Sequence, residues 1–283
     1  MAVPAVLSLR PAIQDDRSRL ANLLHFESHV HRHLDWRRPL DWLGASPFVV
    51  VESAGPLNAA LACPPDPPGI GWIRLFAVDS RMQPGKAWET LWPEATQELK
   101  DLGVDQAAAI PLDNWFRKLV SNSGFEHIHS VVVLEWKAAN SVASKQALHI
   151  RAMQPADIAA VHAVDAAAFA PLWQNSEAAL TAALKQAGHA TVIEENGEIV
   201  AYQISTQSNQ GLHLARLATH PKQQGQGLAK ALVQDVQQKL VDNRWAVLSV
   251  NTQDNNNPSL SLYDKMGFTL NGEQFPIYHL ELK

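Results

Sequence analysis

Two glycines between a strand and a helix form the part of the sequence best suited to chemistry. Residues 212–219 alternate between two faces as a strand does, the strand ends before Pro221, and apolar residues then recur at helical spacing. Between these elements, Gly225 and Gly227 lack a Cβ, so a ligand can approach the backbone closely. The free N–H groups of the first helical turn and the helix dipole favour an anion. The stretch therefore predicts a phosphate-binding loop.

The spacing of this loop separates it from two common nucleotide-binding loops. A Walker loop needs Gly-Lys-Ser/Thr, which the sequence lacks, and a dinucleotide-binding loop needs a third glycine where Lys230 stands. The pattern that fits is [QR]-x-x-G-x-[GA], with Gln224, Gly227 and Ala229 at the defined positions. It resembles the acyl-coenzyme A loop of the GNAT superfamily of N-acyltransferases. Taken alone, the same six residues also fit a helix that simply begins at a glycine.

A second motif supports the resemblance. Residues 256–268 are similar to the N-x-x-S-x-x-L-Y-x-K-x-G-F segment of GNAT proteins, and they follow the glycine loop at the separation found in that family. Physically, Ser259 can begin a helix, Gly267 can end it in a left-handed cap, and Phe268 returns the chain to the core. We expect Tyr263 to lie near the open end of the sheet.

The resemblance implies which residues bind the acyl donor. Backbone N–H groups of the loop would bind the pyrophosphate of coenzyme A, and the end of the preceding strand would pair with the pantetheine amides and the acyl oxygen. Asn256 is expected to contact pantetheine or to stabilise a turn. The implied donor-binding residues are Leu217, Ala218, Thr219, Gln224, Gly225, Gln226, Gly227, Leu228, Ala229 and Asn256.

The resemblance also implies catalytic roles for two side chains. Tyr263 matches a tyrosine that in many GNAT enzymes protonates the departing thiolate, and the alternative is a tyrosine that packs the helix on the core. His213 is the candidate base, because its ordinary pKa of about 6.5 suits proton transfer at neutral pH. It could equally be a strand histidine bonded to backbone or water, with bulk water as the base.

The resemblance also places three residues at the acceptor pocket. Asp165, Phe169 and Trp173 lie in the segment that often lines this pocket in GNAT proteins, although the two aromatic residues also suit a core.

Composition limits the class of protein. A chain of 283 residues with 46% hydrophobic residues fits two domains, each with its own core. A net charge of −5 without a long basic run argues against nucleic acid or a membrane surface as the partner.

Cys63 is the single cysteine, and we see neither an export signal nor a membrane span, so we expect a cytoplasmic protein. His29 and His33 could share a helical face, but without nearby Cys or carboxylate ligands at metal spacing we expect no metal.

The two halves of the chain are an internal repeat. Residues 7–16 resemble 149–157, each a short strand before an acidic helix start, and the hairpin at 48–63 matches the one at 190–205. Residues 70–92 match 211–233, and both copies close on a strand, at 131–136 and 277–282. The predicted fold is α/β (α+β): two tandem GNAT-like domains, each a mixed, largely antiparallel sheet flanked by helices, at 1–137 and 148–283 with a linker at 138–147.

The first copy has lost the residues of the donor site. Pro84 and Lys86 replace Gly225 and Gly227, so one donor N–H is gone and a long side chain occupies the loop. Trp88 replaces Ala229 and Val120 stands in place of Tyr263. We therefore expect a degenerate N-terminal domain whose tryptophans fill the vacated cleft or pack against the second domain. It holds seven of the nine: Trp36, Trp42, Trp72, Trp88, Trp92, Trp115 and Trp136.

The sequence thus predicts an N-acetyltransferase with one intact site. It would move an acetyl group from acetyl-coenzyme A to a primary amine, on a small molecule or a peptide, by direct attack in a ternary complex. The alternative is a non-catalytic acyl-coenzyme A binding or sensor module. The identity of the acceptor, the length of the acyl chain and the oligomeric state are not encoded in any motif that we recognise.

Overall fold

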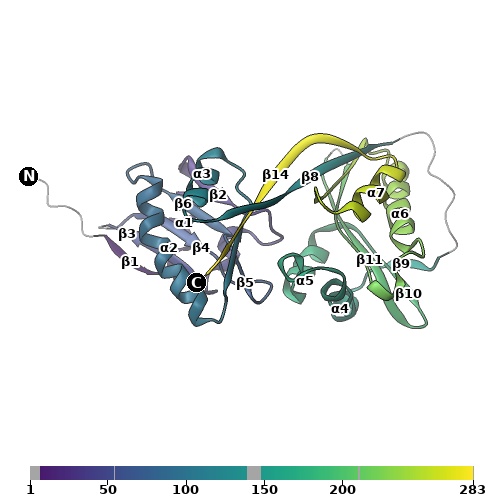
Figure 1. Cartoon of the computed structure of the whole chain (residues 1–283), viewed down its shortest axis with the longest axis horizontal. Helices are drawn as coiled ribbons and strands as arrows, with labels where there is room; N and C mark the ends of the chain where they lie inside the picture. Colours follow the sequence, from purple (N-terminus) through teal and green to yellow (C-terminus); the bar gives the residue numbers. More distant parts are fainter. Residues whose placement is uncertain (1–6, 54, 139–147, 210, 283) are drawn as a thin grey trace, which may run out of the picture. The chain divides into compact units, whose positions relative to one another are not determined.

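The chain folds into two compact units (Figure 1). The computed structural model describes residues 7–53, 55–138, 148–209 and 211–282. Unit 1 contains the described residues up to Ile128 together with those from Phe275 onward, and unit 2 is His129–Gln274. Most of the predicted linker, residues 139–147, lies outside the described residues.

Unit 1 is built around a five-stranded sheet in the order β1-β3-β4-β6-β2. Its remaining strands pair β5 with β7 in parallel and β7 with the end of β14 in antiparallel orientation. The elements are β1 (Ser8–Pro11), η1 (Gln14–Asp16), α1 (Arg17–Phe26), β2 (His29–Arg32), η2 (Pro39–Trp42), β3 (Phe48–Glu52), β4 (Leu57–Ala62), β5 (Ile70–Trp72), β6 (Leu75–Val78), α2 (Pro84–Asp101), β7 (Gln106–Ala109), α3 (Asn114–Asn122) and β8 (Glu126–Lys137).

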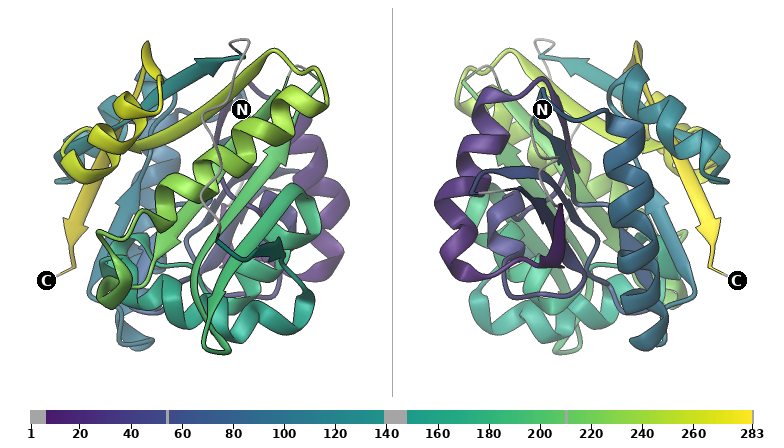
Figure 2. Two further views of the ribbon diagram at one scale, coloured as in Figure 1. Left: turned by 90° about the vertical axis from the view of Figure 1, so that its right-hand side faces the viewer. Right: turned by 90° about the vertical axis from the view of Figure 1, so that its left-hand side faces the viewer.

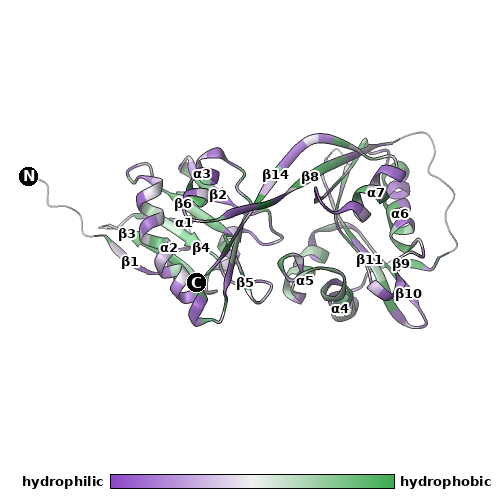
Figure 3. Ribbon diagram, viewed as in Figure 1, coloured by the Kyte–Doolittle hydropathy of each residue, from purple (hydrophilic) through white to green (hydrophobic). Residues whose placement is uncertain are grey.

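Helices cover both faces of the unit 1 sheet, which explains its continuous apolar strands. Val49 and Val51 pack with α2, whereas Phe48 and Val50 pack with α1, so alternate residues of β3 enter different cores. All six residues of β4 are buried. Figure 2 (right) shows α1 in purple and α2 in blue on opposite sides of these strands, and Figure 3 shows α2 with an apolar and a polar side.

Unit 2 has the same plan, with strands in the order β8-β13-β12-β11-β10-β9. Helix α6 lies across one face of these strands (Figure 2, left), and α4 packs against β11 and β12. The elements are β9 (Ile150–Ala152), η3 (Pro155–Asp157), α4 (Ile158–Ala168), η4 (Pro171–Trp173), α5 (Glu177–Gln186), β10 (Ala187–Glu195), β11 (Glu198–Gln207), β12 (Gly211–Thr219), η5 (Pro221–Gln223), α6 (Leu228–Asp242), β13 (Val247–Gln253), α7 (Asn257–Lys265) and β14 (Thr269–Glu281).

The two copies exchange their closing strands. β8 comes from the first copy but pairs antiparallel with β13 of unit 2, from Val247↔Lys137 to Gln253↔Val131. β14 comes from the second copy, and its end pairs with β7 of unit 1, for example Tyr278↔Ala109. The units therefore differ from the predicted division at 137 and 148, because β8 of the first copy continues the strands of unit 2 and the end of β14 of the second copy pairs with β7 of unit 1.

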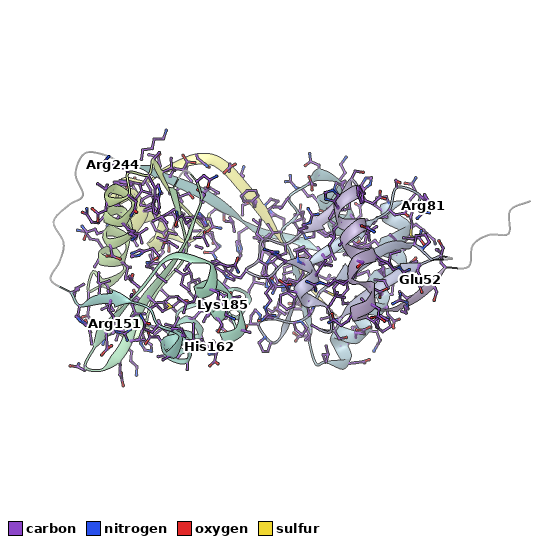
Figure 4. All side chains as sticks on the ribbon, turned by 180° about the vertical axis from the view of Figure 1, so that it is seen from behind. Glu52, Arg81, Arg151, His162, Lys185 and Arg244 are labelled. Carbon is purple, nitrogen blue, oxygen red and sulfur yellow. The ribbon has the colours of Figure 1, made fainter. Side chains whose placement is uncertain are left out.

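Side-chain hydrogen bonds confirm the internal repeat. In the first copy, Arg10 donates to Asp16 at 2.7 Å and to Glu52 at 2.9 Å. In the second, Arg151 donates to Asp157 at 2.7 Å and to Glu194 at 3.0 Å. Each arginine lies on the first strand of its copy and connects the start of a helix to a hairpin. Figure 4 labels Glu52 from the first copy's group and Arg151 from the second copy's group.

Two further properties of the described residues bear on function. None of their helices has the length and apolar character needed to cross a membrane. Over the same residues, no group of three or more His, Cys, Asp and Glu side chains is arranged to hold a metal ion. Cys63 is buried, and burial raises the pKa of its thiol, which makes it a poor nucleophile.

Buried histidines in unit 1 predict a specific pH dependence of stability. His31 is 1% exposed and burial lowers its pKa to about 3, while burial also lowers the pKa of His33. The unfolded chain therefore binds more protons than the folded one below pH 6.5, and each such group costs about 1.4 kcal/mol of stability per pH unit as the pH falls. The variant His31→Phe should reduce the slope of unfolding free energy against pH by that amount between pH 6.5 and 4.5, measured by urea unfolding.

The control is the same change at His25, which is exposed. The carboxylates of Asp16 and Glu52, whose pKa values are lowered to about 2 by their arginine partners, begin to lose their contribution at the lower edge of this window, and the loss is equal in the parent and in His31→Phe. An unchanged slope in His31→Phe would contradict the assignment.

Candidate active site

Strands β12 and β13 separate part-way along their length. They pair in parallel from Gly211↔Val247 to Leu214↔Val250, after which no further pair forms, although β12 continues to Thr219 and β13 to Gln253. On its other edge β12 stays paired with β11 as far as Ala201↔Thr219. One edge of residues 215–219 is therefore left open toward β13.

A bulge in β12 lies where the two strands separate. Ile204 pairs with Arg216 and Ser205 with Leu214, so Ala215 is an extra residue without a partner on β11. Such an insertion bends a strand and increases its twist. It turns the end of β12 away from β13 and so opens the edge described above.

The glycine loop lies between the end of β12 and the start of α6. Gly225 and Gly227 have φ angles of 80° and 84°, and Gly227 is the residue before the first turn of α6. A left-handed backbone, rather than crowding, explains Gly225, because a Cβ built there would meet nothing within 4 Å. The side chain of Gln224 donates to the Thr219 carbonyl at 3.2 Å, which holds the loop against the end of β12. Of the predicted loop residues, Leu228 is 2% exposed and packs in the core, so only its backbone is offered to a ligand.

Thr219 carries an unsatisfied hydroxyl at the end of the open edge. The residue is 8% exposed, and its Oγ1 is buried without a hydrogen-bond partner in the described part of the chain. Buried hydroxyls are normally paired, so this atom is suited to a ligand that reaches the open edge. Leu217 and Ala218, the other predicted strand residues, lie on the same open segment.

Tyr263 lies on the buried side of α7. It is 4% exposed, belongs to the core that includes Leu214 and Val250, and has its ring centroid 5.5 Å from that of Phe268. Burial raises the pKa of its hydroxyl, so the group is protonated at neutral pH. It can therefore act as a proton donor but not as a base.

Both ends of α7 are fixed by hydrogen bonds. The helix begins at Asn257 rather than at Ser259 as predicted, because Asn256 accepts from the Ser259 N–H at 3.3 Å. Asn256 also donates to Gln253 at 3.1 Å, so its side chain serves the turn rather than an open site. At the other end, Gln237 of α6 donates to the Met266 carbonyl at 3.0 Å. These contacts set the position of Tyr263.

His213 lies on β12, immediately before the strands separate. Its Nδ1 is 2.9 Å from the Ser249 hydroxyl, and a further hydrogen bond with Asn251 partly offsets the effect of burial, which lowers the pKa of the ring. The imidazole is therefore neutral at physiological pH. It can accept a proton, and the partners that the structure shows for it are side chains of β13.

The predicted acceptor residues Asp165, Phe169 and Trp173 come together around a residue that the sequence analysis missed. Arg216 donates through Nε to Asp165 at 2.7 Å and through Nη2 to the Trp173 carbonyl at 2.6 Å. The Phe169 ring lies under the guanidinium, 3.6 Å from its carbon to the ring centroid. Asp165 also accepts from the hydroxyl of Tyr202, a second residue that was missed.

Comparison with known proteins agrees with this geometry. The sequence model of the Acetyltransferase (GNAT) family matches residues 158–268, a range that includes the open edge, the glycine loop and Tyr263. Residues 158–268 form a GNAT acetyltransferase domain. The family match indicates an acyltransferase. No curated protein sequence matches the chain.

Solved structures extend the likeness to both copies. A GCN5-related N-acetyltransferase from Sphaerobacter thermophilus is 14% identical, with a TM-score of 0.62 over 100% of this chain and 98% of its own. A tandem GNAT protein from the clavulanic acid biosynthesis pathway is 13% identical, with a TM-score of 0.66 over 98% and 99%. A GCN5-related N-acetyltransferase from Anabaena variabilis is 14% identical, with a TM-score of 0.68 over 98% and 73%. At these identities the likeness establishes the fold: the chain has a tandem GNAT fold.

The first copy of the GNAT fold closes the edge that is open in the second. β5 and β7 pair in parallel only from Ile70↔Gln106 to Trp72↔Ala108, which matches the short pairing of β12 with β13. Beyond that point β6 is paired along its edge by β2, from His29↔Val78 to Arg32↔Leu75. His31 lies at the point of separation, with Nε2 3.2 Å from the Ile73 carbonyl and its ring stacked on Phe116. The histidines considered for a shared helical face belong instead to this strand and the residue after it.

The loop of the first copy is also replaced, as the sequence predicted. α2 begins at Pro84, so the residues that match the glycine loop form an additional helical turn. Trp88 is 4% exposed and stacks on Trp92 in the unit 1 core, while Lys86 is exposed. The edge of β6 is therefore occupied by the backbone of β2 more than by tryptophan side chains.

Sequence signals for the missed residues were weak but present. Arg216 is a charged residue inside an otherwise apolar strand, which is unusual unless the charge is paired or used. Its partner Asp165 lies 51 residues earlier, so no local spacing links them.

The unpaired hydroxyl of Thr219 predicts the effect of its removal. Thr219→Val keeps the shape of the side chain and should leave the free energy of unfolding unchanged or raise it by up to about 1 kcal/mol, because no hydrogen bond is lost. The matched control is Thr191→Val, whose buried hydroxyl accepts from Gln203 at 3.1 Å and should cost about 1 to 2 kcal/mol. Urea unfolding measures both, and a clear loss of stability in Thr219→Val would show that its hydroxyl is bonded.

Proposed function

We propose that unit 2 is an acetyl-coenzyme A-dependent N-acetyltransferase that acts on a primary amine. The observation that carries the proposal is the open edge of β12, which runs directly into a left-handed glycine loop and the start of α6. A thioester with a pyrophosphate at one end and two amides in the middle complements this arrangement. The loop N–H groups would bind the pyrophosphate, and residues 215–219 would pair with the pantetheine amides as a neighbouring strand does.

The transfer needs a polarised carbonyl, a neutral amine and a proton for the thiolate. We assign the acyl oxygen to the main-chain N–H groups of residues 217–219, where a donor placed in advance stabilises the developing negative charge. His213, neutral and beside the acyl position, would take the proton that the amine loses, directly or through a water molecule. Tyr263, held protonated by burial, would supply the proton to the sulfur. The amine attacks the thioester directly, so no covalent enzyme intermediate forms.

Binding of the donor is tested by thermal unfolding with and without excess acetyl-coenzyme A. At about one hundred times the dissociation constant, the ligand should stabilise the folded protein by roughly 2.7 kcal/mol. Gly227→Asp should abolish this shift, because it places a carboxylate where the pyrophosphate binds. Aspartate is chosen because it tolerates the left-handed backbone better than most residues, so the loop should keep its conformation. Gly227→Asn, with the same shape and no charge, should lose less.

The control in the first copy is Lys86→Asp at the matching position. It should leave the shift unchanged, and calorimetric titration should give one acetyl-coenzyme A per chain, because β2 already pairs the edge of β6. Two bound molecules, or equal losses from Gly227→Asp and Lys86→Asp, would contradict a single site in unit 2.

Catalysis is tested by Tyr263→Phe. A general acid typically raises the rate of its reaction roughly 100- to 10,000-fold. Because a thiolate is a good leaving group and needs less help, we expect kcat for thiol release to fall by about 100-fold, the lower end of this range. The acetyl-coenzyme A thermal shift should stay as in the parent. Tyr278→Phe removes a hydroxyl from unit 1 and is the control. A Tyr263→Phe enzyme as fast as the parent would exclude the hydroxyl as the acid, and a parent that binds acetyl-coenzyme A but acetylates no amine would favour a sensor.

A further inference from the structure

Arg216 lies on the acceptor side of the proposed acyl position. Its neighbours Leu214 and Leu217 pack with the α6 face of the sheet, whereas its own side chain contacts α4 and η4 on the opposite face. It stands at the bulge, directly before the residues assigned to the acyl oxygen. A group held by Arg216 would therefore be next to the reacting amine.

The guanidinium is held in one orientation. Asp165 is fully buried, accepts from Nε at 2.7 Å and forms an ion pair with Nη2 at 2.6 Å. The Trp173 carbonyl accepts from Nη2, and the Phe169 ring stacks on the plane of the guanidinium. Asp165 is itself fixed by the Tyr202 hydroxyl and by the Asn175 N–H at 2.8 Å. An arginine positioned in this way loses little side-chain entropy when it binds a ligand.

One nitrogen of the guanidinium remains available. Nε and Nη2 donate as described and Arg216 also has a hydrogen bond with the Tyr202 side chain, but within the described ranges no donation from Nη1 is found, and the side chain keeps 13% exposure. Arginine has five N–H donors, so the two N–H groups of Nη1 remain able to donate. A second carboxylate could accept from Nη1 in a charge-assisted hydrogen bond.

A purely structural ion pair explains these contacts less well. Replacing a buried ion pair by apolar residues is often neutral or stabilising, so packing α4 on β12 does not require a charged pair. Three donors from Arg216, Tyr202 and Asn175 already share the negative charge of Asp165. A ligand carboxylate at Nη1 would lie closer to the guanidinium than to Asp165, so attraction would exceed repulsion.

We propose that the acceptor is a free amino acid, whose carboxylate binds Nη1 of Arg216 while its amine faces the acyl group. This rests on the transferase function proposed for unit 2. His213 and Arg216 both lie on the β12 face opposite α6, three residues apart, which places the base and the carboxylate-binding group on either side of a small acceptor. The chemistry selects amines with a carboxylate within a few bonds of the nitrogen.

The test compares acceptors that differ only in the carboxylate. Thiol release from acetyl-coenzyme A is measured with the twenty L-amino acids, and with the carboxamide and the decarboxylated amine of each one that reacts. The parent should prefer the acid by about 10- to 100-fold in kcat/KM, the range expected for a hydrogen bond between charged groups. Most of the difference should be in KM, because the carboxylate is bound equally in the ground state and the transition state.

The informative variant is Arg216→Lys, which keeps a cation beside Asp165 but cannot present a second edge. It should reduce the preference for the acid to less than about threefold while the acetyl-coenzyme A thermal shift stays as in the parent. Arg244→Lys is the matched control, at an exposed arginine of the same unit that Figure 4 labels, and it should keep the preference.

The outcomes separate the two proposals. Turnover of amines without a preference for the acid, or a preference that persists in Arg216→Lys, would overturn the assignment to amino acids and leave the transferase function intact. Binding of acetyl-coenzyme A without thiol release for any amine would overturn both.

Discussion

The need of the backbone for hydrogen-bond partners governs how the two copies differ. A parallel pair of strands that separates part-way leaves N–H and C=O groups without partners in a largely buried place, which is costly unless something fills the edge. In unit 1 the chain fills the edge itself, because β2 pairs with β6 along its whole length. In unit 2 residues 215–219 have no such strand, and the bulge at Ala215 holds the edge open. One set of backbone groups in unit 2 is thereby left for a ligand to satisfy.

The framework around this edge is the same in both copies. The arginine of the first strand, the aspartate at the helix start and the acid of the hairpin form the same ion pairs in each unit. None of them touches the open edge, so they serve the fold whether or not a site is present. Residues of the site have diverged instead: the left-handed glycines became a helical turn, and the tyrosine became Val120, which is buried in the unit 1 core. Exchange of β8 and β14 links the two copies, since β13 pairs with a strand of the first copy and β7 pairs with a strand of the second.

Local patterns in the sequence predicted the elements that local chemistry determines. Gly225 and Gly227 adopt left-handed angles because only glycine does so without strain, and Tyr263 falls on the buried side of α7 because its neighbours have helical periodicity. The repeat predicted two similar sheets, and Asp165, Phe169 and Trp173 were predicted to lie together. Pairing between distant segments was not readable. The closing strands look alike in both copies, and nothing in their residues shows which sheet each one joins. Likewise, β2 is only four residues long and its buried residue is His31 rather than an apolar one, so it gives no recognisable strand pattern.

The first copy also shows how the chain replaces an acceptor. Arg74 lies at the bend between β5 and β6, one residue before the position that matches Arg216, and its Nη1 pairs with Asp35 at 2.9 Å. Trp42 lies under its guanidinium, with the carbon 4.9 Å from the ring centroid, as Phe169 lies under Arg216. Its Nη2 donates to the Asp66 carbonyl, an oxygen from the chain's own loop, while its Nε is buried without a partner in the described chain. In unit 1 the chain therefore supplies a strand for the edge, a helical turn for the loop and an oxygen for the arginine. In unit 2, Arg216 also lies beside an aspartate and an aromatic ring, but no donation from its Nη1 is found in the described chain, as expected if a ligand provides that oxygen.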